Sequence, residues 1–286
     1  MFKNFSYILY KILFLFDKII KLVIKKSVLS WFKVFLHQDS YKSLKVLDKK
    51  LTFFIPNKLT EWRVDTFFSK EPETLEWIDS FKKNQEIIFW DIGANIGLYS
   101  LYTCLKHSNS NIIAFEPSTS NLRVLSRNIS MNNFENKIKI VPMPLNKKEN
   151  NFSLMYESDF IEGGALNSFD KELNFEGKKF QSDLKYNVIG TSINYLLQNK
   201  IIQIPDYIKI DVDGLEHLIL EGADQFLNNK KIKSLSIEIN ENYLEHYEKI
   251  LSIMEKNQFK ILHKKNNKDM IRSKNLNKTY NYLFIR

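Results

Sequence analysis

Stretches typical of buried strands alternate with stretches typical of helices along most of this chain, and this order restricts the fold more than any other feature. The strand-like stretches are residues 87–92, 111–115, 137–145, 207–212, 234–239, 259–263 and 279–285, with helical patterns at 97–106, 121–132, 215–226 and 242–257. Parallel strands joined by helices form a sheet that is covered on both faces. The last two strands have no helix between them. We therefore expect an α/β, doubly wound, mostly parallel seven-stranded sheet of Rossmann-like type, with an antiparallel C-terminal strand pair.

The alternation is interrupted between residues 146 and 206. Strand-like stretches at 151–156 and 186–190 flank a loop that carries Gly163 and Gly164. A long, loop-rich insertion inside a compact domain is usually functional. We expect one domain over residues 51–286, in which the insertion 146–206 forms a lid or one wall of a substrate pocket.

The excess positive charge lies at the N-terminus. The chain carries a net charge of +9, and residues 1–50 hold eleven lysines against three aspartates, which leaves +1 for the rest. A nucleic-acid enzyme would carry its basic surface around its site, so we expect no nucleic acid as partner. The longest unbroken apolar run of the first 26 residues is 12–16. This is too short for a spanning helix, which needs roughly 20 residues.

Residues 1–50 instead predict a basic amphipathic helical extension. Asn4, Lys11, Lys18 and Lys25 recur every seven residues, and Lys21 lies on the same side. In one interpretation residues 1–36 lie in the surface of an anionic membrane. In the other, the apolar face packs on the domain and the lysines stay in solvent. Since no secretory signal pattern is evident, the expected location is the cytoplasm, with peripheral contact to the inner face of the membrane under the first interpretation.

The strongest chemical signal is the segment 89–97, FWDIGANIG. An apolar strand ends in Asp91, and a tight loop with Gly93 and Gly97 opens a helix, an arrangement in which the backbone closely approaches a ligand. In a dinucleotide site this loop reads G-x-G-x-x-G and faces a pyrophosphate. Here Asn95 replaces a glycine, and the carboxylate of Asp91 would repel a pyrophosphate. It suits a ligand with an ammonium group, such as S-adenosylmethionine.

A second acid, Glu116, follows the strand 111–115, nineteen residues after Gly97. An acid in this place accepts hydrogen bonds from both ribose hydroxyls of a bound nucleotide. S-adenosylmethionine and NAD share the ribose, so a nicotinamide-dependent oxidoreductase stays open as an alternative. A non-catalytic scaffold that keeps the cofactor site and docks through its N-terminal helix is a second alternative.

At this point the sequence resembles the FkbM-type methyltransferases. The resembling segments are KEPETLEWI at 70–78, WDIGANIG at 90–97, AFEP at 114–117, IKIDVDG at 208–214 and LEGA at 220–223. The resemblance implies a class I methyltransferase fold, S-adenosylmethionine as methyl donor, and O-methylation, often of sugars or secondary metabolites. It assigns cofactor contacts to Asp91, Gly93, Asn95, Gly97 and Glu116.

The acceptor side of the chain departs from the family pattern. Asp213 stands where the family more often has glutamate, and Asn194 stands where it often has aspartate. The expected acceptor is a hydroxyl of a small molecule, a glycan or a glycolipid.

Candidate catalytic residues follow from the rule that open α/β sheets bind ligands beyond the carboxyl ends of their strands. A hydroxyl that attacks a methyl carbon has to lose its proton, which a carboxylate or histidine within hydrogen-bond reach accepts. We expect Asp211 in this role, with Glu238 and His217 as alternatives. His217, one turn into a helix, equally fits a packing residue. Although carboxylates with a histidine can hold a divalent cation, we expect no catalytic metal.

Overall fold

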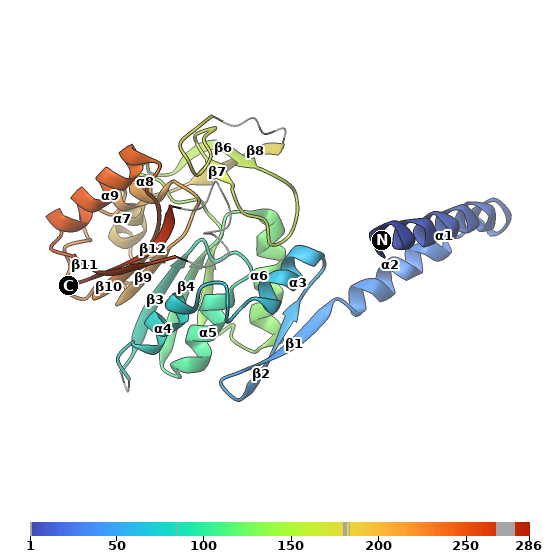
Figure 1. Ribbon diagram of the computed structural model, residues 1–286, viewed down its shortest axis with the longest axis horizontal. Coiled ribbons are helices and arrows are strands. Elements are labelled where there is room, and N and C mark those ends of the chain that lie inside the picture. The colour runs from blue at the N-terminus through green and yellow to red at the C-terminus, as the bar shows by residue number, and fades with distance from the viewer. Residues whose placement is uncertain (1, 84, 180–181, 183, 267–277) are drawn as a thin grey trace.

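The computed structural model describes residues 2–83, 85–179, 182, 184–266 and 278–286. Its centre is a seven-stranded sheet with the order β11-β12-β10-β9-β3-β4-β5 (Figure 1). The strands are β3 (Ile87–Ile92), β4 (Ser110–Phe115), β5 (Ile138–Val141), β9 (Tyr207–Ile210), β10 (Ser234–Asn240), β11 (Lys260–Lys265) and β12 (Thr279–Ile285). Strands β5, β4, β3, β9 and β10 are parallel, and β12 runs antiparallel to both β10 and β11. The predicted mixed sheet with its antiparallel C-terminal pair is confirmed.

Apolar side chains on both faces of this sheet explain why its strands read as continuous apolar runs. In β3, Ile88 and Trp90 belong to the core of one face, while Ile87 and Phe89 belong to the core of the other. The first face packs on α7 (Ile193–Gln198), α8 (Glu216–Glu221) and α9 (Leu244–Lys256). The second packs on α4 (Pro72–Asp79), α5 (Leu98–Lys106) and α6 (Thr119–Met131). The fold is therefore doubly wound.

The insertion forms a small antiparallel sheet of its own over the carboxyl ends of the central strands (Figure 1). Its strands are β6 (Asn151–Glu157), β7 (Ser168–Phe169) and β8 (Leu184–Gly190), in the order β7-β6-β8. The two strands expected in this part of the sequence are β6 and β8. Residues 158–167, between β6 and β7, form the loop that we call the cover loop.

The N-terminal region is helical only to residue 38. Helices α1 (Phe2–Ile24) and α2 (Val28–Gln38) precede a β-hairpin of β1 (Tyr41–Val46) and β2 (Lys49–Phe54), which α3 (Lys58–Asp65) follows. The expectation of helix up to residue 50 is wrong for residues 41–50. Leu47 and Asp48 adopt positive φ angles of 48° and 63° in a tight turn, and Phe53 and Phe54 of β2 are fully buried. The burial of these side chains therefore stabilises a β-hairpin in this segment instead of a helix.

The apolar side chains of the β-hairpin belong to the core of the second sheet face. The side-chain oxygen of Asn128, in α6, accepts a hydrogen bond from the backbone N–H of Phe54. Asn132, which follows α6, accepts from the backbone N–H of Thr52 and donates to its carbonyl. Helices α1 and α2 project from the domain (Figure 1). Among the described residues, no helix is both long enough and apolar enough to cross a membrane.

Candidate active site

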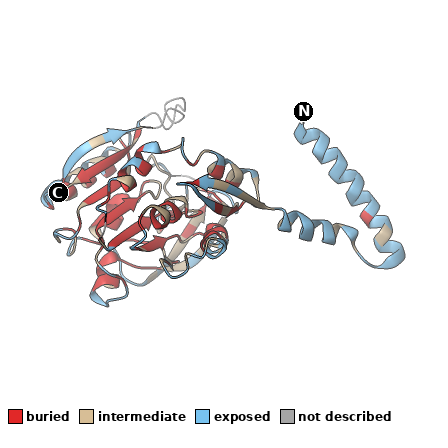
Figure 2. Cartoon of the chain, turned by 90° about the horizontal axis from the view of Figure 1, so that it is seen from below, coloured by how far each residue is buried: buried red, intermediate tan, exposed pale blue. Residues whose placement is uncertain are grey.

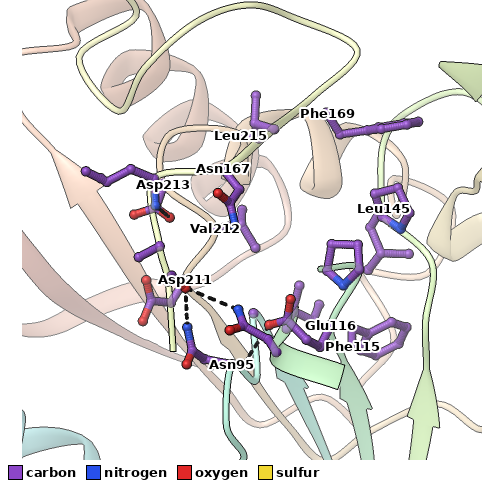
Figure 3. Close-up of a pocket in the computed structure, with 18 of the residues that line it drawn as sticks. Asn95, Phe115, Glu116, Leu145, Asn167, Phe169, Asp211, Val212, Asp213 and Leu215 are labelled. Atoms are coloured by element: carbon purple, nitrogen blue, oxygen red, sulfur yellow. Dashed lines mark hydrogen bonds between the residues drawn. The ribbon is translucent and has the colours of Figure 1, made fainter. Parts of the chain in front are cut away.

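A cavity of about 310 Å³ opens at the carboxyl ends of β3, β4, β9 and β10, beneath the cover loop. Figure 3 shows Asp211 and Asp213 on one side of it and Leu145 and Phe169 on the other. Polar and charged groups line one part of the cavity, and apolar side chains line the rest. The polar and charged set includes Asn95, Glu116, Asp211, Asp213 and Glu238, and the apolar set includes Phe115, Met143, Leu145, Val212 and Ile219.

The two glycines of the loop after β3 serve different purposes. Gly93 lines the cavity with a φ of +83°, and a Cβ atom at this position would lie 1.9 Å from the backbone oxygen of Asp211. Gly97 has a φ of +86°, but its missing Cβ makes room for Leu125 of α6, at 2.5 Å. Only glycine adopts such angles without strain. Gly93 therefore brings the loop against β9, while Gly97 packs α5 on α6 instead of lining the cavity.

Glu116 and Asn95 form one connected unit at the cavity wall. The Glu116 carboxylate accepts hydrogen bonds from the backbone N–H groups of Asn95 (2.8 Å) and Ser118 (2.9 Å). Burial raises the pKa of Glu116 to about 7 despite these bonds. The Oδ1 atom of Asn95 is buried without a hydrogen-bond partner among the described residues. A buried acceptor beside a fixed carboxylate fits a ligand that carries several donors, as the ribose and amino groups of S-adenosylmethionine do.

Asp91 lies behind the loop and outside the cavity lining. Its Oδ2 atom accepts a hydrogen bond of 2.6 Å from Ser100 of α5, and the residue is completely buried. Burial raises the pKa of Asp91, an effect that the charge of Lys209 opposes. The structure thus does not bring Asp91 to the cavity surface, where the sequence predicts a contact with the cofactor.

A buried lysine organises the acids around it. Lys209 is 2% exposed in the middle of β9, and its Nζ lies 2.8 Å from Oδ2 of Asp211. Burial opposes its charge, but Asp211, Glu71 and Asp91 hold the pKa of Lys209 above its usual value. In turn, Lys209 and Lys70 outweigh burial and hold the pKa of Asp211 below its usual value. Asp211 is therefore ionised at neutral pH.

The pKa values of Asp213 and Glu238, which lie near Asp211 in the cavity, are raised instead of lowered. Burial and then the charge of Asp211 raise the pKa of Asp213 to about 7. Burial, Asp211 and Asp213 raise the pKa of Glu238 well above its usual value. The backbone N–H of Leu166, in the cover loop, donates to Oδ2 of Asp213 at 2.6 Å. The pKa of Asp211 is thus lowered while those of its neighbours Asp213 and Glu238 are raised within the same cavity.

His217 lies outside this group. Its ring contacts Tyr243 and His246, with centroid separations of 6.2 and 5.2 Å, and burial lowers its pKa to about 4. The residue that supports the loop after β9 is its neighbour Glu216, which accepts from the N–H groups of Val212 and Gly214 and contacts His246 at 2.5 Å. The structure therefore places His217 in a packing position outside the cavity lining, the second of the two roles expected for it.

The cover loop is held from several directions. Its Gly164 carbonyl accepts from Asn95 (2.7 Å) and Asn121 (3.1 Å), and its Gly163 carbonyl accepts from Nε of Arg63 in α3 (2.6 Å). With the bond from Leu166 to Asp213, the loop connects α3, the glycine loop, α6 and the segment after β9. The cover loop is thus hydrogen-bonded directly to residues that line the rest of the cavity.

Sequence reasoning missed Lys209, Lys70 and Arg63. The signal for Lys209 was present, since a lysine inside the apolar run IKI of a buried strand needs a partner. Lys70 opens the resembling segment 70–78 but drew no role there, Arg63 lies outside the resembling segments, and both line the cavity. Among the described residues, no three side chains of the metal-binding types converge on one point.

Comparison with known proteins decides the family. Residues 91–261 match the family described as "Methyltransferase FkbM domain". This chain belongs to that family. The FkbM domain covers the sheet from the end of β3 to β11, including every carboxyl group of the cavity. The methyl donor of the family is S-adenosylmethionine. The polar part of the cavity fits its amino acid and ribose groups, and the apolar part fits its adenine ring.

The FkbM domain has distant relatives. "Methyltransferase sdnD" of Sordaria araneosa is 29% identical over 154 residues, which are 47% of this chain and 60% of that protein. "Methyltransferase 1" of Beauveria bassiana is 24% identical over 148 residues, 47% of this chain and 57% of that protein. These matches span about three fifths of the curated relatives.

Solved structures are similar at low identity. Pyrococcus horikoshii TYW2 in complex with MeSAdo has a TM-score of 0.45 at 12% identity, over 86% of this chain and 70% of that one. The precorrin-6y C5,15-methyltransferase of Geobacter metallireducens has a TM-score of 0.42 at 13% identity, over 76% and 88%.

Proposed function

We propose that this protein transfers a methyl group from S-adenosylmethionine to a hydroxyl oxygen of its acceptor. The observation that carries the proposal is the set of three carboxyl groups, Asp211, Asp213 and Glu238, whose environments push their pKa values apart inside one cavity. Such separated pKa values are typical of sites that move protons. When bound, S-adenosylmethionine supplies an activated methyl group on its sulfonium.

In this proposal Glu116 and Asn95 hold the ribose, and Gly93 lets the backbone approach the amino acid part. The apolar wall around Phe115 and Leu145 receives the adenine. Asp91 acts indirectly, by anchoring α5 through Ser100 beneath the loop. Gly97 acts indirectly as well, by fixing how α5 packs on α6.

Asp213 is the proposed proton acceptor. A base with a pKa near the working pH is both available and strong enough to take a hydroxyl proton. The Asp213 carboxylate would take the proton of the acceptor hydroxyl as the methyl group passes to its oxygen, which would leave S-adenosylhomocysteine as the second product. Asp211, ionised beside Lys209 and Lys70, is a weaker base and is suited to hold the reactants in line. Glu238, whose pKa burial and the neighbouring carboxylates raise well above its usual value, is the carboxyl group suited to donate a hydrogen bond to the acceptor.

The proposed acceptor is a glycan or glycolipid presented at a membrane, with the enzyme in the cytoplasm. Three carboxyl groups accept hydrogen bonds, and the neighbouring Arg63 and Lys70 donate them. Such a lining matches an acceptor molecule with several hydroxyl groups, since a hydroxyl group both donates and accepts. The net charge of +1 outside residues 1–50 gives no support for nucleic acid as partner.

The test is methyl transfer from radiolabelled S-adenosylmethionine to a panel of glycans, glycolipids, phenols and amines. The proposal predicts an ether product that resists mild base, made by the wild type and lost in Asp213→Asn. Asp159→Asn, an exposed change in the cover loop, is the matched control and retains turnover. An N-methylated product would refute the hydroxyl acceptor, and full turnover of Asp213→Asn would refute the assigned base.

A further inference from the structure

Helices α1 and α2 form a helical hairpin that exposes almost all of its apolar surface (Figure 2). Monomeric proteins rarely leave a patch of this kind uncovered. The hairpin meets the domain at its base, where the ring of His37 lies 5.1 Å from that of Phe54. Its most exposed large apolar residues, each more than 60% accessible, are Phe2, Leu15, Leu22, Val23, Ile24, Trp31 and Leu36.

Specific side-chain bonds build this hairpin. Asp17, the buried acid in α1, accepts hydrogen bonds of 2.9 Å from the backbone N–H of Leu29 and from the hydroxyl of Ser27. The same Ser27 caps the N-terminus of α2 by accepting from Ser30. The bond from Leu29 contributes most to holding the pKa of Asp17 below its usual value. A single acid therefore fixes the turn from which the two helices diverge (Figure 2).

The charges of the hairpin select what can cover it. Residues 1–38 contain seven lysines and one acid, the buried Asp17. In α1 the positions of Lys3, Lys11, Lys18 and Lys21 fall within a sector of about 80° at 3.6 residues per turn. A second copy of the hairpin would cover apolar surface but would leave the lysine sector without a negative partner. A surface that is apolar inside and anionic outside matches both features.

The lysine side chains already lie along aromatic rings. Nζ of Lys11 is 5.2 Å from the ring centre of Tyr7, and Nζ of Lys18 is 5.2 Å from that of Phe14. Helices that combine lysines with aromatic side chains are typical of a membrane interface.

We propose that the α1–α2 hairpin docks this protein on an anionic lipid bilayer, lying in the interface with its lysines toward the headgroups. This inference is independent of the reaction. It supports the proposed membrane-borne acceptor because α3, which follows the β-hairpin, contributes Trp62 and Arg63 to the cavity. The rim residues Trp62 and Leu166 are 44% and 43% exposed.

The experiment is flotation of the full chain with vesicles of phosphatidylcholine alone or with 30% phosphatidylglycerol (about a third of the lipid, enough for a negative surface potential). Binding to the anionic vesicles is expected to exceed binding to neutral ones by more than about 25-fold, the contribution of two lysines alone, and to fall with salt. Lys11→Gln with Lys18→Gln should lower the partition coefficient about 25-fold, since each lysine near the surface contributes roughly fivefold.

The matched control is Lys82→Gln with Lys83→Gln, two exposed lysines after α4. It should bind within twofold of wild type. No flotation, equal flotation with neutral vesicles, or equal loss in the control would each overturn the proposal. So would a stable dimer in sedimentation velocity that the change Leu15→Asp dissociates. Binding of S-adenosylhomocysteine, measured in parallel, reports on the domain alone and separates failure of docking from failure of the proposed function.

Discussion

Replacing Gly93 by alanine should abolish cofactor binding while the domain stays folded. The new Cβ would lie 1.9 Å from the Asp211 carbonyl oxygen, whereas ordinary contacts begin near 3.4 Å. One of the two backbones must therefore move by about 1.5 Å, and the φ of +83° adds roughly 1–2 kcal/mol of strain for a residue with a Cβ. A displacement of about 1 Å in an active site can lower the reaction rate about 100-fold.

The assay is isothermal titration with S-adenosylhomocysteine, together with thermal unfolding. We expect at least 100-fold weaker binding for Gly93→Ala and a cooperative transition at a lower temperature. Gly177→Ala is the matched control, because Gly177 has a similar φ of +72° but faces the movable ring of Tyr243. It should bind like wild type. If Gly93→Ala bound with unchanged affinity, the loop would not be the cofactor cradle that we infer.

Three further changes test other parts of the site. Because burial raises the pKa of Glu116 to about 7, a ligand that needs the carboxylate should bind fully above pH 7 and about tenfold more weakly per pH unit below it; titration calorimetry of Glu116→Gln should show weaker but pH-independent binding, and a parallel pH dependence would contradict the assignment. Asp213→Asn should lower kcat by about 10²–10⁴-fold and remove the acidic limb of its pH profile near pH 7, whereas an unchanged limb would point to another base. Lys209→Met should lower the free energy of unfolding by about 3–5 kcal/mol because it leaves buried carboxylates unpaired; Lys139→Met, at an exposed position of β5, should cost less than about 1 kcal/mol in urea denaturation, and equal losses would show that the ion pairs of Lys209 do not matter.

Much of the fold could be predicted because buried parallel strands carry their own signature. Residues 87–92 are apolar on both faces and are flanked by helical patterns, and the structure buries every residue of β3. The β-hairpin at 41–54 was missed because its lysines continue the charge pattern of α1 and α2, while its apolar residues are covered by α6, about 80 residues later in the chain.

The site was predictable where chemistry is local to a strand end. The cavity is lined, as expected, by Glu116, Asp211 and Glu238. The reason is that the carboxyl ends of parallel strands meet at one edge of the sheet. The position of a residue along a helix does not reveal which neighbour its side chain meets, so the sequence left His217 open between a proton acceptor and a packing residue. Bonds such as those from Arg63 and Asn95 to the cover loop join residues 69 to 100 positions apart and leave no local pattern.

The most direct test of the central claim is titration of the wild type with S-adenosylhomocysteine and with NAD, beside Glu116→Gln and the exposed control Glu135→Gln. Our account predicts binding of S-adenosylhomocysteine alone, with the affinity reduced about 10- to 100-fold by Glu116→Gln, as expected for loss of hydrogen bonds to a charged group, and unchanged by Glu135→Gln. Binding of NAD in its place, or no binding of either ligand, would contradict it.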